Sequence, residues 1–166
     1  MQALINLNTF EYVPRSTAVN IIDSRYVFKI KEDDNGHPIK YKARLCPRGF
    51  KQRSGIDYND IFSPVARYIS IRILLSIVAV NDFDIDNMDV DTAFPNADLD
   101  EDIFMEVPDS LEKISGMVVK LNKALYGLKQ SPRQWNLLIH NFLLSINFKQ
   151  TVEDACIYVY TADMVN

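Results

Sequence analysis

The sequence predicts an α+β fold, in which strands and helices are mixed without a regular βαβ repeat. Several short segments alternate between apolar and polar residues, as strands do. Two longer segments instead have the length and the broad apolar face of a helix. The chain has 166 residues, of which 48% are hydrophobic and 24% charged, so it has the composition of one globular domain or a large part of one.

The clearest strand pair surrounds the turn at residues 33–36, Asp-Asp-Asn-Gly. Before the turn, apolar side chains alternate with basic ones from Ser24, and after it the same alternation continues to Leu45. This pattern predicts a β-hairpin over residues 24–45 with one apolar face and one basic face. Further strands are expected at residues 83–90, 103–107, 117–121 and 155–160.

Two helices are expected, at residues 69–80 and from Ser131 to about Ile146. Ser70 is the candidate cap of the first helix. The second begins with Ser131, Pro132 and Gln134 in the order of a capping box, with proline at the first helical position. Residues 1–19 show no clear period, and we expect them to form a poorly ordered lead-in.

Cysteine usage and hydropathy limit the classes of protein. Cys46 and Cys156 are far apart and lack metal-ligand spacing, which favours a reduced, intracellular protein. The longest apolar run, residues 73–80, is far shorter than a membrane span, and no signal peptide is visible in residues 1–20. We therefore expect no membrane partner and a cytoplasmic location, with the nucleus as the alternative.

Charge is segregated along the chain, although the formal net charge is only −4. Residues 20–53 hold nine basic and four acidic side chains, residues 81–112 hold twelve acidic and no basic ones, and residues 113–150 hold six basic and no acidic ones. One interpretation is three solvated surfaces. The other is a cation-binding centre flanked by walls that bind phosphate.

The acid-rich stretch from Asp82 to Asp91 does not match the simpler acidic sites. An EF-hand loop that starts at Asp82 would lack its glycine and its final glutamate. The triplet from Asp91 to Ala93 lacks the glycine of an aspartic protease. A third hypothesis is phosphoryl transfer through two metal ions, with Asp89 as one carboxylate at a strand end; a solvated sheet edge is the alternative.

Two basic features complete the candidate site. Lys31, Lys42 and Arg44 lie on the basic face of the hairpin and could hold a triphosphate or a nucleic-acid backbone. The turn with Tyr126, Gly127 and Lys129 precedes the second helix and could bring backbone amides and a lysine to a nucleotide or template. An ordinary strand face and an ordinary glycine turn remain the alternatives.

Taken in chain order, nine blocks form a family pattern: residues 24–31, 40–45, 49–58, 62–67, 70–72, 88–94, 103–108, 125–135 and 154–156. Over residues 20–160 this pattern resembles the reverse-transcriptase domain of copia-type retrotransposons. The resemblance implies a right-hand polymerase fold, with fingers at residues 20–80 and 113–150 and palm segments at 81–112 and 151–160. Residues 161–166 would be a tail.

The resemblance also implies function: an RNA-directed DNA polymerase that uses two Mg²⁺ ions, an RNA or DNA template-primer and dNTPs. Asp89 would be catalytic and, with the carbonyl of Val90, would bind metal. Other positions would bind dNTP or template, with Phe94 as the aromatic gate beneath the sugar: Lys31, Lys42, Arg44, Thr92, Ala93, Phe94, Tyr126, Gly127 and Lys129.

Three departures from the family pattern bear on activity. Pro95-Asn96-Ala97 stands where Leu-Asn-Gly is common, and Cys46-Pro47 where Val-Ala is common. We further expect the chain to stop before the Tyr-x-Asp-Asp hairpin, because Tyr160 to Met164 only faintly echoes it. The expectation is a fragment that is inactive alone and lacks its remaining palm and RNase H portion. A non-catalytic nucleic-acid-binding module and a structural protein without a ligand are the alternatives.

Overall fold

The computed structural model describes residues 1–160, and its chain divides into two compact units. The first comprises Met1–Ile61 and Thr92–Trp135, and the second Phe62–Asp91 and the chain from Asn136. The tail at residues 161–166, with most of the Tyr160 to Met164 segment, lies outside the described residues. The mixed helix and strand content agrees with the predicted α+β class.

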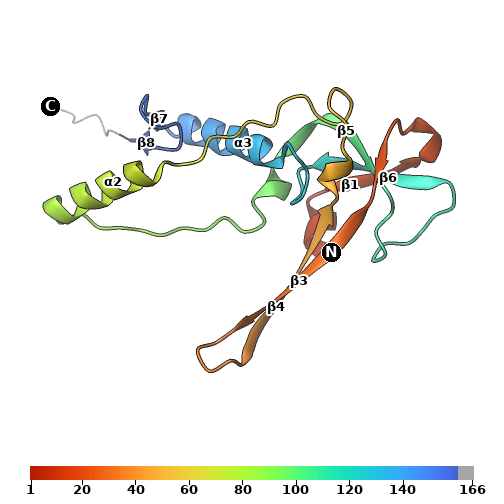
Figure 1. Cartoon of the computed structure of the whole chain (residues 1–166), viewed down its shortest axis with the longest axis horizontal. Helices are drawn as coiled ribbons and strands as arrows, with labels where there is room; N and C mark the ends of the chain where they lie inside the picture. Colours follow the sequence, from red (N-terminus) through yellow and green to blue (C-terminus); the bar gives the residue numbers. More distant parts are fainter. Residues whose placement is uncertain (161–166) are drawn as a thin grey trace. The chain divides into compact units, whose positions relative to one another are not determined.

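A four-stranded sheet forms the centre of the first unit (Figure 1). Its order is β1-β6-β5-β2, where the strands are β1 (Phe10–Pro14), β2 (Ile21–Ile22), β5 (Asp98–Met105) and β6 (Met117–Lys123). β6 is antiparallel to both neighbours, whereas β2 runs parallel to β5. The core consists of apolar side chains from these strands, from β4 and from the turn after β6: Ile22, Leu45, Ile103, Met105, Val119, Leu121, Leu125 and Leu128.

The first nineteen residues differ from the expectation of a poorly ordered lead-in. They contain α1 (Gln2–Asn6), β1 and a 3-10 turn, η1 (Arg15–Thr17). β1 pairs with β6 over five residues, from Phe10 opposite Leu121 to Pro14 opposite Met117. The segment is ordered by this distant partner rather than by its own pattern.

The expected hairpin is confirmed as β3 (Ser24–Glu32) and β4 (Pro38–Pro47), which extends away from the sheet in Figure 1. In its register Val27 lies opposite Arg44, and two lysine pairs follow on the same face. The other face is apolar and open: Phe28 and Tyr41 each remain 76% exposed. A second 3-10 turn, η2 (Gly49–Lys51), follows β4.

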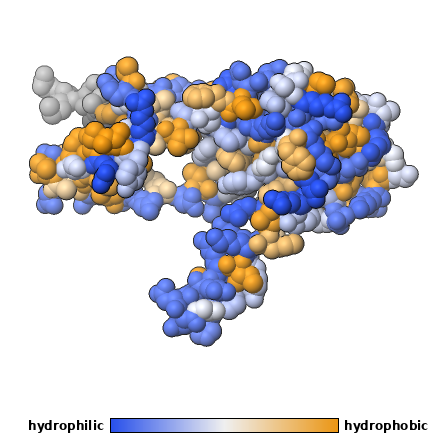
Figure 2. All heavy atoms as spheres, in the orientation of Figure 1, coloured by the Kyte–Doolittle hydropathy of each residue, from blue (hydrophilic) through white to orange (hydrophobic). Residues whose placement is uncertain are grey.

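The second unit contains α2 (Tyr68–Asn81), which confirms the first expected helix. Ser70 is not its N-cap. The cap residue is Arg67, whose backbone N–H donates to Asp154 Oδ2 at 2.9 Å. No residue of α2 is buried, and Figure 2 shows apolar atoms gathered at its surface.

The remaining elements agree only in part with the sequence. α3 (Ser131–Ser145) confirms the second expected helix. The predicted capping box is wrong, because Ser131 Oγ donates to the Leu125 carbonyl and Gln134 Nε2 donates to Asp100. Residues 83–90 belong to no strand. The last expected strand is reduced to β8 (Tyr158–Val159), which pairs with β7 (Lys149–Gln150).

Candidate functional site

The turn at Gly127 is in direct backbone contact with the end of β4. Gly127 has φ +112°, and a Cβ added to it would lie 2.4 Å from the Pro47 carbonyl oxygen. A Cβ on Gly49 would lie 2.0 Å from the Gly127 carbonyl oxygen. Both positions therefore need glycine for close approach, and Gly127 also needs it for its backbone angle. The contact holds the turn against the base of the hairpin.

Three of the residues expected to bind nucleotide meet at this turn. The rings of Phe94, from η3 (Phe94–Asn96), and Tyr126 have centroids 4.3 Å apart. The guanidinium carbon of Arg44, from β4, lies 5.5 Å from the centroid of the Tyr126 ring. The aromatic pair and the cation–π contact each stabilise such a cluster by about 0.5–1.5 kcal/mol. We call these three residues the aromatic cluster; its rings can stack on a sugar or base, and its guanidinium can bind phosphate.

Lys129 has a different partner. Its Nζ donates to the Tyr58 hydroxyl at 3.0 Å and lies 4.7 Å from the centroid of that ring. Its backbone N–H donates to Gln52 Oε1 at 2.8 Å. Lys129 lies on the same turn as Tyr126, and the segment that follows β4 holds it in place.

The two other basic candidates lie farther along the hairpin. Lys42 pairs with Lys29 in register, and Lys31 pairs with Lys40. Lys31 stands four residues beyond Val27, the partner of Arg44, which is about 13 Å along the strand. The structure therefore groups Lys31 and Lys42 into a basic face, and does not bring Lys31 to the aromatic cluster.

The two residues expected to bind metal and two of those expected to bind dNTP belong to different units. Asp89 and Val90 are exposed and belong to the second unit, whereas Thr92 and Ala93 belong to the first. Thr92 adopts φ +56°, which is unusual for a β-branched residue, and its carbonyl accepts a hydrogen bond from Asn96 Nδ2 at 3.0 Å.

The departure at Pro95-Asn96-Ala97 is accommodated without a glycine. Phe94 to Asn96 form the 3-10 turn η3, in which Pro95 is buried. Ala97 has φ −90°, an ordinary value for any residue, and its N–H donates to the Phe94 carbonyl at 2.9 Å. The turn therefore presents the Phe94 ring to Tyr126 with alanine at the position that commonly holds glycine.

The donor set does not fit a two-metal centre. The Asp89 carboxylate and the Val90 carbonyl are oxygen donors of the kind that Mg²⁺ prefers. Two divalent ions need more than one carboxylate to offset their repulsion and lost hydration. Within residues 1–160, no three His, Cys, Asp or Glu side chains gather closely enough to hold a metal ion.

Part of the acidic block has a structural use. Asp98 Oδ1 lies 2.6 Å from Lys123 Nζ, and Asp102 Oδ1 lies 2.6 Å from Lys120 Nζ. These ion pairs connect β5 to β6, across the register shift between Asp98 and Ile103. Acidic and basic blocks that looked separate in the sequence thus neutralise one another across two strands.

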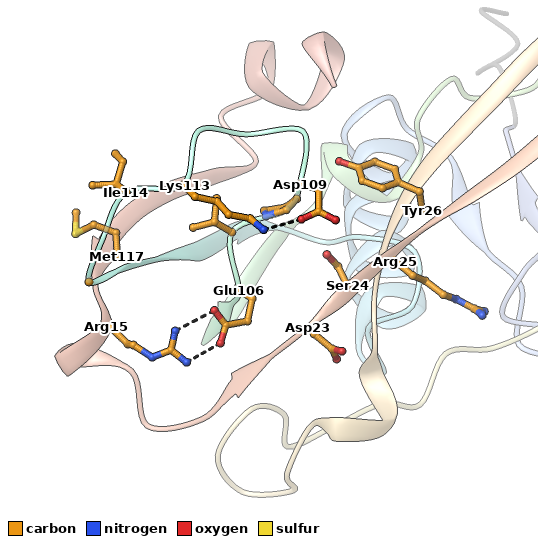
Figure 3. Close-up of a pocket in the computed structure, with 13 residues that line it drawn as sticks. Arg15, Asp23, Ser24, Arg25, Tyr26, Glu106, Asp109, Lys113, Ile114 and Met117 are labelled. Atoms are coloured by element: carbon orange, nitrogen blue, oxygen red, sulfur yellow. Dashed lines mark hydrogen bonds and ion pairs between the residues drawn. The ribbon is translucent and has the colours of Figure 1, made fainter.

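A cavity of about 690 Å³ opens elsewhere in the first unit (Figure 3). Arg15 donates to both carboxylate oxygens of Glu106, at 2.9 and 2.6 Å, and this contact lowers the pKa of Glu106. Lys113 Nζ lies 2.7 Å from Asp109 Oδ1. Three basic and three acidic side chains line the cavity, so it lacks the excess positive charge that a triphosphate site needs: Arg15, Asp23, Arg25, Glu106, Asp109 and Lys113.

Sequence reasoning missed Gln52, Tyr58 and Gln130. All three contact Lys129 or its neighbours, and Gln52 and Gln130 are buried. Their only signal was membership in two of the family blocks, because an uncharged polar side chain in a loop gives no indication that it is buried.

Comparisons with known proteins identify the family of this chain. Residues 7–165 match the family model described as reverse transcriptase (RNA-dependent DNA polymerase), and the chain belongs to that family. It is 42% identical, over 95% of its length, to the retrovirus-related Pol polyprotein from transposon TNT 1-94 of Nicotiana tabacum. It is 38% identical, over 96% of its length, to the corresponding polyprotein from transposon RE1 of Arabidopsis thaliana.

These relatives confirm the resemblance to copia-type retrotransposons. The chain covers only 12% and 11% of the two polyproteins. No solved structure matches it. In residues 1–160, no helix combines the length and the apolar character that crossing a membrane requires.

Proposed function

We propose that this chain is the fingers and part of the palm of a retrotransposon reverse transcriptase, and that its aromatic cluster binds the incoming dNTP. The single observation that carries the proposal is the meeting of Arg44, Phe94 and Tyr126 from three separate segments. Two aromatic rings, tilted by 40° to one another, and a guanidinium offer partners for the three parts of a nucleotide: base, sugar and phosphate.

The test is dGTP binding to the full chain, measured by isothermal titration calorimetry. Tyr126→Ala should weaken binding by roughly tenfold or more, because stacking on an aromatic side chain contributes about 1–3 kcal/mol per base. Tyr68→Ala is the matched control, since Tyr68 forms a similar cation–π pair with Arg72, at 5.2 Å, in the other unit. Equal affinities for wild type and Tyr126→Ala would contradict the proposal.

Selection against ribose belongs to Phe94 in this proposal. Its ring would lie beneath the sugar, and removing it should raise the affinity for GTP relative to dGTP. The measurement is the ratio of the two dissociation constants for wild type and for Phe94→Ala. A ratio that does not move would remove the gate assignment while leaving the aromatic cluster as a binding site.

Nucleotidyl transfer by this chain alone is not part of the proposal. The family generally uses Mg²⁺, but the donor set around Asp89 and Val90 is too small for two ions. We propose that primer extension needs the rest of the palm. We also propose that the fingers comprise residues 20–80 and 113–150, and that the palm segments comprise residues 81–112 and 151–160. Extension by the chain alone that is lost in Asp89→Ala would overturn this point.

A second candidate function is a nucleic-acid-binding module without catalysis. The observation that favours it is the basic face of β3–β4, where Lys29, Lys31, Lys40 and Lys42 face one way with Arg44. Salt-sensitive binding of a primer–template that is unchanged in Asp89→Ala would support this candidate. A cytoplasmic location, with the nucleus as the alternative, is proposed for either function and can be tested by imaging the tagged chain.

A further inference from the structure

Three buried polar residues are hydrogen-bonded to the turn that carries Tyr126 and Lys129, or to one another. Gln52 is 6% exposed, Asp57 is 1% exposed and Gln130 is fully buried. Burying an amide or a carboxylate without partners is unfavourable, so such residues persist where their hydrogen bonds are complete. We call them the buried amide network.

The side-chain amides of Gln52 and Gln130 can form all their hydrogen bonds in only one pair of orientations. Gln52 Oε1 accepts from the Lys129 N–H at 2.8 Å, and Gln52 Nε2 donates to Gln130 Oε1 at 2.9 Å. Gln130 Nε2 then donates to the Asp57 carbonyl at 2.8 Å and to Glu101 Oε2 at 3.2 Å. Flipping either amide would set donor against donor or acceptor against acceptor.

Asp57 fixes the loop that carries these contacts. Its Oδ2 accepts from the Arg53 N–H and from Asn20 Nδ2, both at 2.6 Å. The loop from Arg53 to Tyr58 is thereby closed on itself and tied to the residue before β2. The same loop presents the Tyr58 hydroxyl that accepts from Lys129 Nζ.

The network and the contact between Gly49 and Gly127 both join this turn to the segment that follows β4. We infer that Gln52 and Gln130 are positioning residues of the nucleotide-binding site. They hold Lys129, and Tyr126 three residues before it, in the arrangement that receives the nucleotide. This inference rests on the proposed function. Neither amide touches the nucleotide; each acts through the backbone and side chain of the turn.

The test compares Gln130→Met with wild type in the full chain. Methionine has a similar length but cannot donate to the Asp57 carbonyl or accept from Gln52. Gln134→Met is the matched control, because Gln134 is also buried, at 8% exposed, but donates to Asp100 instead. Two measurements are made on each folded variant: the dissociation constant for dGTP, and hydrogen exchange at the Lys129 amide.

We expect Gln130→Met to weaken dGTP binding by about tenfold and to speed Lys129 exchange by about tenfold, with Gln134→Met near wild type in both. A folded Gln130→Met with wild-type dGTP affinity would reduce the network to a structural role and overturn the inference. If the wild-type chain does not bind dGTP, the proposed function fails. Independently of that result, a Lys129 exchange rate that is the same in Gln130→Met and wild type would refute the positioning role.

A second variant covers failure to fold. Gln52→Met removes the donor to Gln130 and the acceptor for the Lys129 N–H without placing a charge in the buried amide network. It should also weaken dGTP binding. The double variant Gln52→Met/Gln130→Met should lose less stability than the two single variants added together, without regaining dGTP affinity, because each single variant leaves the other amide unpaired. Recovery of both properties in the double variant would contradict the positioning role.

Discussion

Gly127→Ala adds a single methyl group, yet we expect it to lower the free energy of unfolding of the first unit by several kcal/mol. Two separate costs arise. At φ +112° an alanine is outside the regions that L-residues favour, which costs about 1–2 kcal/mol. Its Cβ would also lie 2.4 Å from the Pro47 carbonyl oxygen, and moving that backbone should cost about a further 1–3 kcal/mol.

Gly36→Ala separates the two costs. Gly36 has φ +82°, and nothing lies within 4 Å of its added Cβ, so only the backbone term applies. Gly49→Ala tests the contact from the opposite side, because its Cβ would lie 2.0 Å from the Gly127 carbonyl oxygen. We expect Gly36→Ala to be mild and the other two variants to be severe.

The assay is urea unfolding followed by the fluorescence of Trp135, the chain's one tryptophan, which belongs to the first unit. With a slope of about 1–3 kcal/mol per molar urea, an extra loss of about 2 kcal/mol should lower the midpoint by about 1 M relative to Gly36→Ala. A Gly127→Ala midpoint equal to that of Gly36→Ala would refute the backbone contact.

Two further predictions concern pH and salt. Backbone hydrogen bonds from Arg67 and Cys156 lower the pKa of Asp154 below its ordinary 3.8, so the unfolded chain takes up the proton first. The second unit, which contains α2 and most of α3, should therefore lose stability as pH falls below about 3.8, measured as a loss of helical circular dichroism. Asp154→Asn should remove most of this dependence. Replacing Lys40 and Lys42 with alanine should reduce the slope of log K against log salt for primer–template binding by about 0.9 for each phosphate that these lysines neutralise in the wild type. An unchanged slope would exclude the basic face from that interface.

Local patterns explain which elements were predictable. The β3–β4 hairpin follows from its own alternation and its turn, and α2 and α3 follow from length and apolar face. β1 was missed because its pairing partner, β6, is remote in the chain. Residues 83–90 alternate between apolar and polar side chains as a strand does. Alternation predicts which side chains share a face, but it does not supply a neighbouring strand. Within residues 1–160, no strand pairs with this segment.

The site divides in the same way. Family order identified Arg44, Phe94 and Tyr126, and the structure brings these three together. Gln52 and Gln130 could not be found from sequence, because their role depends on hydrogen bonds to each other across the fold.

The position of β1 has a practical consequence for anyone who expresses part of this chain. β1 occupies one side of β6, whose sequence from Met117 to Leu121 is largely apolar. A recombinant piece that begins at the hairpin, near Ser24, would leave that side of β6 as an open row of unpaired N–H and C=O groups. Such an edge invites pairing with the edge of another molecule, so fibrils or inclusion bodies are the expected product of trimming what looks like a dispensable leader.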